Sequence, residues 1–226
     1  MHRTVMKYIY RLVYIIMPAA IVMAFLYAPP AEGLGESSRL LYVHVPLAWV
    51  SVLAFSVSGI LSLLFLFTGN GERTERVHAA RNSAAIGLLF TVLATFSGSV
   101  WSKLSWGAYW NWDPRQTSII VLMLVYIAYF SLESALRENS SRPRIVSAYL
   151  VFAMVTVPFF VFVVPRMFPS LHPDPIINPD RQVHLESAMK ISLMTAIAAF
   201  TLLYGYLLDL ANRVTAIKEQ QKGHLL

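Results

Sequence analysis

Long apolar stretches separated by short polar segments dominate the pattern along the chain. Each stretch approaches the roughly 20 residues that a helix needs to cross a bilayer. Backbone groups inside lipid must be satisfied within the segment itself, so each stretch is predicted to be a helix. The pattern therefore predicts an all-α integral membrane protein, a single domain over residues 1–226 with six transmembrane helices. The six stretches are Tyr8–Tyr27, Val43–Phe67, Asn82–Trp101, Thr117–Leu136, Ile145–Pro165 and Ser187–Leu210.

The first stretch has an alternative interpretation as a signal peptide, because Arg3, Lys7 and Arg11 precede or open it. Its apolar run is long for a signal sequence, and Pro29-Pro30 is a poor context for cleavage. We therefore expect an uncleaved first helix.

Composition supports a membrane protein and removes several other classes. Hydrophobic residues make up 57% of the chain and charged residues 13%, against about 25% charged in an average soluble domain. The abundance of Leu, Ile, Val and Phe excludes intrinsic disorder. The chain has no cysteine, which excludes disulfides, iron–sulfur clusters and thioether attachment of a cofactor to this chain.

The distribution of charge predicts the orientation in the membrane. The N-terminus, the Gly69–Arg81 and Arg137–Arg144 loops and the C-terminal tail, with the adjoining helix ends, together carry twelve basic and six acidic residues. The remaining segments carry six of each, so the whole excess of +6 lies on the first set. The positive-inside rule then places both termini in the cytoplasm. The loops predicted on the opposite face are Ala28–Tyr42, Ser102–Gln116 and Arg166–Glu186.

One of these outer loops is unusually rich in tryptophan. Four of the five tryptophans fall between Trp101 and Trp112. An aromatic belt at the membrane surface is one interpretation, but a belt would spread such residues over many helix ends. Their concentration in one loop favours a platform on which a planar apolar ligand stacks. A porphyrin and a quinone ring both fit this description.

Three histidines lie near the predicted outer face. His44 stands at the outer start of the second helix, and Pro46 is expected in the first turn of that helix. His172 lies in the third outer loop, and His184 stands near the outer start of the sixth helix. Neutral imidazole is a common metal ligand, so these side chains are candidate ligands.

The segment Trp106-Gly-Ala-Tyr-Trp110-Asn-Trp112-Asp113 resembles the pattern W-G-x-x-W-x-W-D, the tryptophan-rich signature of the heme-handling protein family. Its fixed positions here are Trp106, Gly107, Trp110, Trp112 and Asp113. The chain length and the six predicted spans are similar to the CcmC-type members. The resemblance implies a protein that binds heme at the periplasmic membrane surface. It would deliver that heme to a periplasmic heme chaperone for c-type cytochrome biogenesis.

The resemblance also implies the ligands. CcmC-like proteins carry one functional histidine before the second helix and one in the last outer loop. His44 matches the first position, and His172 matches the second better than its rival His184. These two would be axial ligands of heme b, one on each face of the iron. The resemblance implies that the heme is bound transiently and non-covalently, and the absence of cysteine agrees because it excludes thioether links to this chain.

Two arginines are the candidate partners of the heme propionates, because a guanidinium pairs well with a carboxylate. They are Arg115, directly after Asp113-Pro114, and Arg39, five residues before His44. A headgroup contact or a local salt bridge is the alternative for both. Asp113 is expected either to cap the fourth helix or to contact the ligand.

The resemblance implies partners in the cytoplasmic (inner) membrane: ABC-transporter subunits, a small single-span subunit and the heme chaperone, with no role for nucleic acid. ATP would be bound elsewhere, because the chain has no G-x-x-x-x-G-K-[ST] motif. Such a protein is not a conventional enzyme, although it could act as a heme lyase together with its chaperone. The alternatives are a membrane b-type cytochrome and a small-molecule transporter. The first would place paired histidines inside facing helices, and the second would carry charged residues near the midplane.

Overall fold

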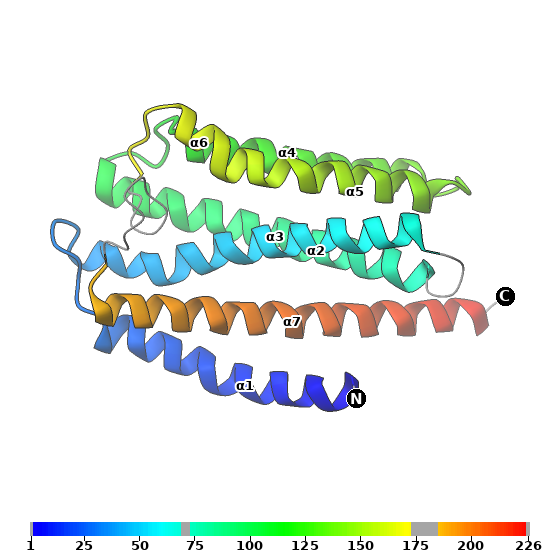
Figure 1. The fold of residues 1–226 in the computed structure, drawn as a ribbon, viewed down its shortest axis with the longest axis horizontal. Coiled ribbons are helices and arrows are strands. Elements are labelled where there is room, and N and C mark those ends of the chain that lie inside the picture. Colours follow the sequence, from blue (N-terminus) through cyan, green and yellow to red (C-terminus); the bar gives the residue numbers. More distant parts are fainter. Residues whose placement is uncertain (1, 69–72, 173–184, 225–226) are drawn as a thin grey trace.

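A computed structural model describes residues 2–68, 73–172 and 185–224, which form a bundle of long helices running side by side (Figure 1). The α-helices are α1 His2–Val22, α2 Leu41–Phe67, α3 Arg73–Trp106, α4 Pro114–Ala135, α5 Arg142–Pro158, α6 Val164–Met167 and α7 Ser187–His224. Three short helices of other types lie near one end: the π-helices η1 Met23–Tyr27 and η3 Phe159–Val163, and the 3-10 helix η2 Glu36–Leu40.

Six helical stretches of the described chain are long and apolar enough to cross a membrane. This confirms the predicted fold class, and the chain is a multi-pass membrane protein. Both termini lie towards the same end of the bundle, as an even number of spans requires (Figure 1). The stretches are Tyr10–Tyr27, Glu36–Phe67, Glu75–Trp106, Pro114–Ala135, Arg142–Met167 and Ser187–Gln221.

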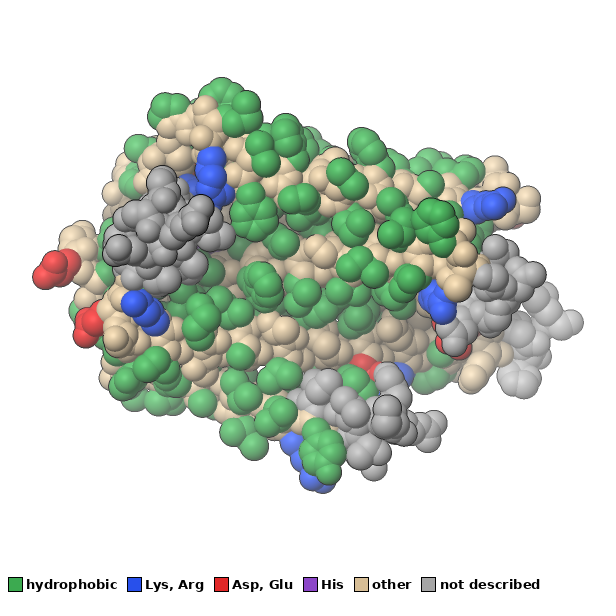
Figure 2. Space-filling model, viewed as in Figure 1, with side chains coloured by type: hydrophobic (Ala, Val, Ile, Leu, Met, Phe, Trp, Pro, Cys, Tyr) green, Lys and Arg blue, Asp and Glu red, His purple; other side chains and the backbone are tan. Residues whose placement is uncertain are grey.

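The helix α2 lies at the centre of the bundle and contacts α3, α5 and α7. α1 packs along α7 at one edge, and α4 and α5 form the opposite edge (Figure 1). Figure 2 shows apolar side chains along the flank of the bundle, with the charged ones mostly towards its two ends. This is the distribution expected for a protein whose flank faces lipid and whose ends face water.

Small residues allow the helices to pack closely, as is common between membrane helices. The ring of Phe55 on α2 stacks on Tyr126 of α4 with ring centres 3.5 Å apart. A Cβ atom at Gly87 of α3 would lie 2.5 Å from that phenylalanine ring, so only glycine fits there. At the α1–α7 contact the corresponding small residues are alanines: Ala20, Ala24, Ala196 and Ala199.

Several helices extend beyond the apolar stretches that predicted them. α3 continues past the expected end at Trp101 to Trp106, and α7 continues past Leu210 to His224. Hydropathy indicates the part of a helix that crosses lipid, whereas backbone hydrogen bonds continue into the polar turns beyond it. The tryptophan-rich loop is correspondingly shorter than the predicted Ser102–Gln116, because α3 continues to Trp106.

The prolines have local effects on the helices. Pro46 lies inside α2 rather than in its first turn, because η2 leads directly into a helix that begins at Leu41. The prediction for this residue was therefore wrong. Pro158 ends α5, and the chain continues as the π-helix η3. Pro18 lies inside α1. A proline in a helix removes one backbone donor, which lipid cannot replace.

Candidate functional site

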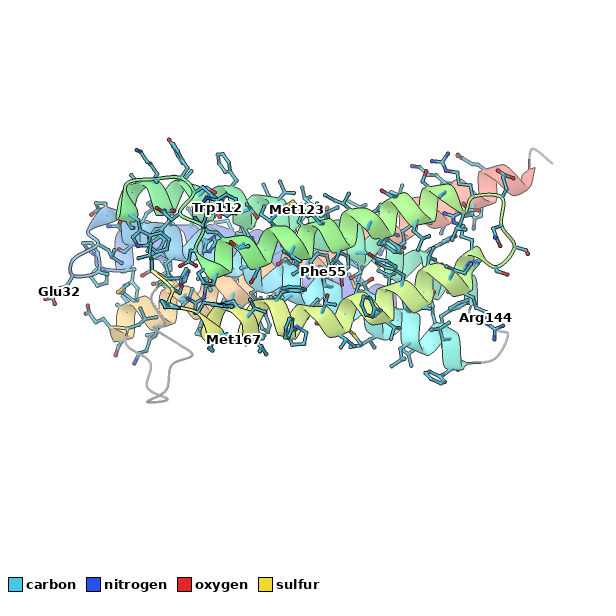
Figure 3. All side chains as sticks on the ribbon, turned by 90° about the horizontal axis from the view of Figure 1, so that it is seen from above. Glu32, Phe55, Trp112, Met123, Arg144 and Met167 are labelled. Carbon is cyan, nitrogen blue, oxygen red and sulfur yellow. The ribbon has the colours of Figure 1, made fainter. Side chains whose placement is uncertain are left out.

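The predicted site residues that the structure describes lie at one end of the bundle. They come from η2 and the start of α2, the end of α3, the loop between α3 and α4, the start of α4, and the segment after α6. Figure 3 shows Trp112 of this loop at the end of the molecule opposite Arg144. His184 lies outside the described residues, so the choice between His172 and His184 stays a prediction.

His44 projects from α2 onto α3, where its ring is held by hydrogen bonds. Its Nδ1 atom lies 3.0 Å from the carbonyl oxygen of Ala94 and 3.2 Å from Oγ of Ser97. A carbonyl oxygen only accepts, so Nδ1 carries the proton and donates it to Ala94. The other ring nitrogen, Nε2, then keeps its lone pair. The hydrogen bond to Ala94 thus orients the ring and leaves Nε2 able to bind a metal ion.

Gly98 provides the space for this ring. A Cβ atom at Gly98 would lie 2.8 Å from Cε1 of His44 and 3.2 Å from its Nδ1. A side chain at this position would therefore displace the imidazole. The packing of α2 on α3 thus determines where His44 lies.

His172 lies opposite His44 and is surrounded by aromatic rings. The centres of the two imidazole rings are 6.5 Å apart. Trp101 lies 5.6 Å and Trp106 6.4 Å from the His172 ring, again between ring centres. Two imidazoles on opposite sides of one metal ion, with metal–nitrogen bonds of about 2 Å, have ring centres about 6 Å apart. The described structure therefore brings two candidate ligands to a separation that suits a single ion.

Asp113 connects the tryptophan-rich loop to the segment that carries His172. Its side chain is 4% exposed. One carboxylate oxygen caps α4 by accepting the backbone N–H of Arg115 at 2.9 Å. The other accepts the hydroxyl of Ser170 and the backbone N–H of Leu171, both at 2.8 Å. A buried carboxylate needs such donors, so the segment beside His172 is fixed to the start of α4.

Arg115 reinforces this connection. Its Nη1 donates to Oγ of Ser170 at 3.2 Å and to the carbonyl oxygen of His172 at 3.1 Å. Arg39 pairs with Glu36 and donates to the carbonyl oxygens of Ala24 and Ala28 at the end of the first span. The assignment of both arginines to propionates stays a prediction.

The loop between α3 and α4 is held in an unusual backbone conformation. Gly107 ends α3 with a φ of 83°, and Trp112 has a φ of 56°, which is rare for a large side chain. The side-chain amide of Asn111 donates to Ser102 at 2.7 Å, which ties the loop to α3. The rings of Trp110 and Trp112 pack edge to face with centres 5.9 Å apart. Trp112 is 78% exposed, so the loop presents one aromatic face outward.

The structure therefore divides the predicted tryptophans into two groups. Trp106 lies beside His172, whereas Trp110 and Trp112 form the outer pair. Trp101 was not predicted to belong to the site, although it lies nearer to His172 than Trp106 does. The only signal for it was its place in the tryptophan-rich run. No signal in the sequence indicated Ser97, Gly98 or Ser170.

Comparison with known proteins gives a consistent family match. The family described as heme exporter protein C matches residues 1–225. A putative cytochrome c biosynthesis ccmC-like mitochondrial protein of Marchantia polymorpha is 31% identical over 195 residues, covering 86% of this chain and 80% of the relative. Heme exporter protein C of Rhodobacter capsulatus is 26% identical over 211 residues, covering 89% and 85%. The Escherichia coli K12 protein of that name is 28% identical over 189 residues, covering 84% and 74%.

The Asp113 contacts predict the effect of removing one carboxylate oxygen. In Asp113→Asn an N–H₂ group replaces an acceptor, so either the α4 cap or the bonds to Ser170 and Leu171 are lost. The expected cost is about 1–3 kcal/mol, concentrated in this segment. Hydrogen–deuterium exchange should rise in peptides that contain Leu171. The matched control is Glu36→Gln, an exposed carboxylate at the same end. Equal exchange in the two variants would show that Asp113 does not hold the segment.

Proposed function

The chain belongs to the heme exporter protein C family, and from this premise we propose that it binds heme between His44 and His172 and delivers it to a periplasmic heme chaperone. Membership of the family gives the chain a role in heme handling for cytochrome c maturation. The observation that carries the finer proposal is the 6.5 Å separation of the two imidazole rings beside Trp101 and Trp106.

The two histidines are proposed as axial ligands of the heme iron. An ion held by two imidazoles alone needs further ligands, and a porphyrin supplies four ring nitrogens of its own. His44 would bind through Nε2, because Nδ1 donates to Ala94. His172 is held through its backbone by Arg115 and through its neighbours by Asp113. The proposal thus combines one ligand fixed by helix packing with one fixed by loop hydrogen bonds.

The tryptophans would contact the porphyrin rather than the iron. Trp101 and Trp106 pack edge to face with ring centres 4.9 Å apart and form an apolar wall beside His172. Such a wall favours a planar apolar ring and excludes water from part of it. Trp112, which packs against the half-buried Trp110, presents an exposed aromatic face that suits contact with the heme edge during delivery. Arg39 and Arg115 are the proposed partners of the propionates, because a guanidinium pairs well with a carboxylate.

The heme is proposed to be heme b, held transiently. The chain has no cysteine, so no thioether bond can attach the heme to it. Bound heme would supply an iron centre that the chaperone can accept, which makes the protein a carrier rather than a conventional enzyme. His44 and His172 come from two separate elements, so the loss of the bond between either histidine and the iron would open the site. That arrangement suits release better than a site enclosed within the bundle.

The charge distribution and the family support a proposal for the orientation and the partners of the protein. The excess of +6 on one set of segments supports cytoplasmic termini and a heme site on the periplasmic face of the inner membrane. ABC-transporter subunits, a small single-span subunit and the heme chaperone are the proposed partners. Loss of heme to the chaperone separates this function from that of a b-type cytochrome, which would retain its heme.

Replacement of each histidine tests the ligand assignment. His44→Ala and His172→Ala should each lower the heme retained per purified protein by at least about tenfold, the scale of loss for weakened metal sites. Transfer to the chaperone should fail in both. Absorption spectroscopy of the purified proteins measures retention, and His78→Ala, at the other end of the bundle, is the control. Normal behaviour of His172→Ala combined with failure of His184→Ala would identify His184 as the second ligand.

Replacement of the outer tryptophans tests the role of the loop. Trp110→Ala combined with Trp112→Ala should reduce heme transfer to the chaperone while the protein remains in the membrane, because the two rings pack on each other and Trp112 is exposed. The transfer is measured as heme bound to the chaperone per unit of membrane protein. Trp49→Ala, on the flank of α2, serves as the control. Transfer at the wild-type level would reduce the loop to an anchor at the membrane surface.

A further inference from the structure

A second candidate site lies at the end of the bundle opposite the histidines. A cavity of about 530 Å³ is lined there by residues of α2, α3, α4 and α5 and of the loop between α4 and α5. Figure 3 shows Arg144 at this end, far from Trp112. Its lining includes Arg81, Glu133, Arg142 and Arg144. None of these residues takes part in the proposed heme site.

Glu133 organises two of these arginines. Its side chain is 10% exposed, and its two oxygens lie 2.9 and 3.0 Å from Nε of Arg81. Nη2 of Arg142 lies 2.8 Å from one of the same oxygens. The carboxylate therefore joins α3, α4 and α5 and fixes both guanidinium groups. Each guanidinium has five N–H donors. The bonds to Glu133 use some of them and fix the direction of the others.

The cavity combines positive charge with an apolar wall. Three arginines and one glutamate leave two positive charges within the lining. Ser140 and Ser141 add hydroxyl groups, while Phe65, Leu66 and Val146 provide apolar surface. The ion pairs with Glu133 give Arg81 and Arg142 a structural role, but they do not involve the third arginine, Arg144. Charge of this kind beside apolar surface suits a ligand with an anionic head and an apolar remainder.

We propose that this cavity binds a phosphate group, in the first place that of an anionic phospholipid. Guanidinium groups match phosphate oxygens with two parallel hydrogen bonds. The cavity lies where the span Glu36–Phe67 ends and the span Arg142–Met167 begins, which is the level of lipid headgroups. Basic pockets between membrane helices bind anionic headgroups on the cytoplasmic side. The proposal is independent of heme binding.

The experiment compares ligands by their effect on thermal unfolding of the full chain purified in a neutral detergent. The three ligands are phosphatidylglycerol, phosphatidylcholine and inorganic phosphate, at about 0.15 M salt to screen distant charges. Phosphatidylglycerol should raise the melting temperature of the wild type. Arg144→Gln should weaken its apparent affinity about tenfold, the change expected for one charged hydrogen bond. Arg137→Gln removes the same charge from an exposed position outside the cavity lining and should resemble the wild type.

The outcomes distinguish the sources of the phosphate. Stabilisation by phosphatidylglycerol but not by inorganic phosphate identifies a lipid, and equal stabilisation by both identifies a soluble phosphate. Either result supports the site if Arg144→Gln weakens the stabilisation by the ligand and Arg137→Gln does not. Equal stabilisation by phosphatidylcholine overturns the proposal, because the headgroup charge would then be irrelevant. Equal losses in the two arginine variants also overturn it, as does a wild type that no ligand stabilises.

Discussion

The carboxylate of Asp113 is the interaction on which the geometry of the candidate site depends. It is buried, so its three hydrogen bonds are needed to offset the loss of water. One bond begins α4, and the other two hold Ser170 and Leu171. Arg115 donates its backbone N–H to Asp113, and its side chain also donates to the carbonyl oxygen of His172. The same few atoms therefore start a membrane helix and place a candidate ligand beside a helix from another part of the chain.

Buried carboxylates also join separate helices elsewhere in the described structure. Among the residues that the structure describes, three carboxylates are buried, and each joins elements that are distant in sequence: Asp113, Glu133 and Asp209. Asp209 on α7 accepts a hydrogen bond from Tyr10 of α1 and pairs with Arg213. Charged groups near lipid are costly unless they are paired, which explains why these occur with their partners. Apolar packing aligns the spans, and these polar contacts fix the positions of their ends.

The fold was largely predictable, whereas the site was predictable only in part. Hydropathy gave the six spans because lipid requires a minimum apolar length, but it could not give helix ends that lie in water. His44, His172 and Trp106 could be selected because unusual side chains are concentrated in the predicted outer loops. Trp101 and Gly98 could not, because their roles depend on how α3 extends and on which of its faces meets α2. The contact of Arg115 with a backbone carbonyl likewise leaves no pattern in the sequence.

The central claim is that helix packing fixes His44 so that it and His172 bind one iron. Electron paramagnetic resonance of the ferric, heme-loaded protein tests this directly, because two imidazole ligands give a low-spin iron. The wild type should show a single low-spin species. Gly205→Ala, where a Cβ meets nothing within 4 Å, should show the same species, whereas Gly98→Ala should lose it as the His44 ring is displaced. A high-spin wild type, or a Gly98→Ala spectrum identical to that of the wild type, would contradict the account.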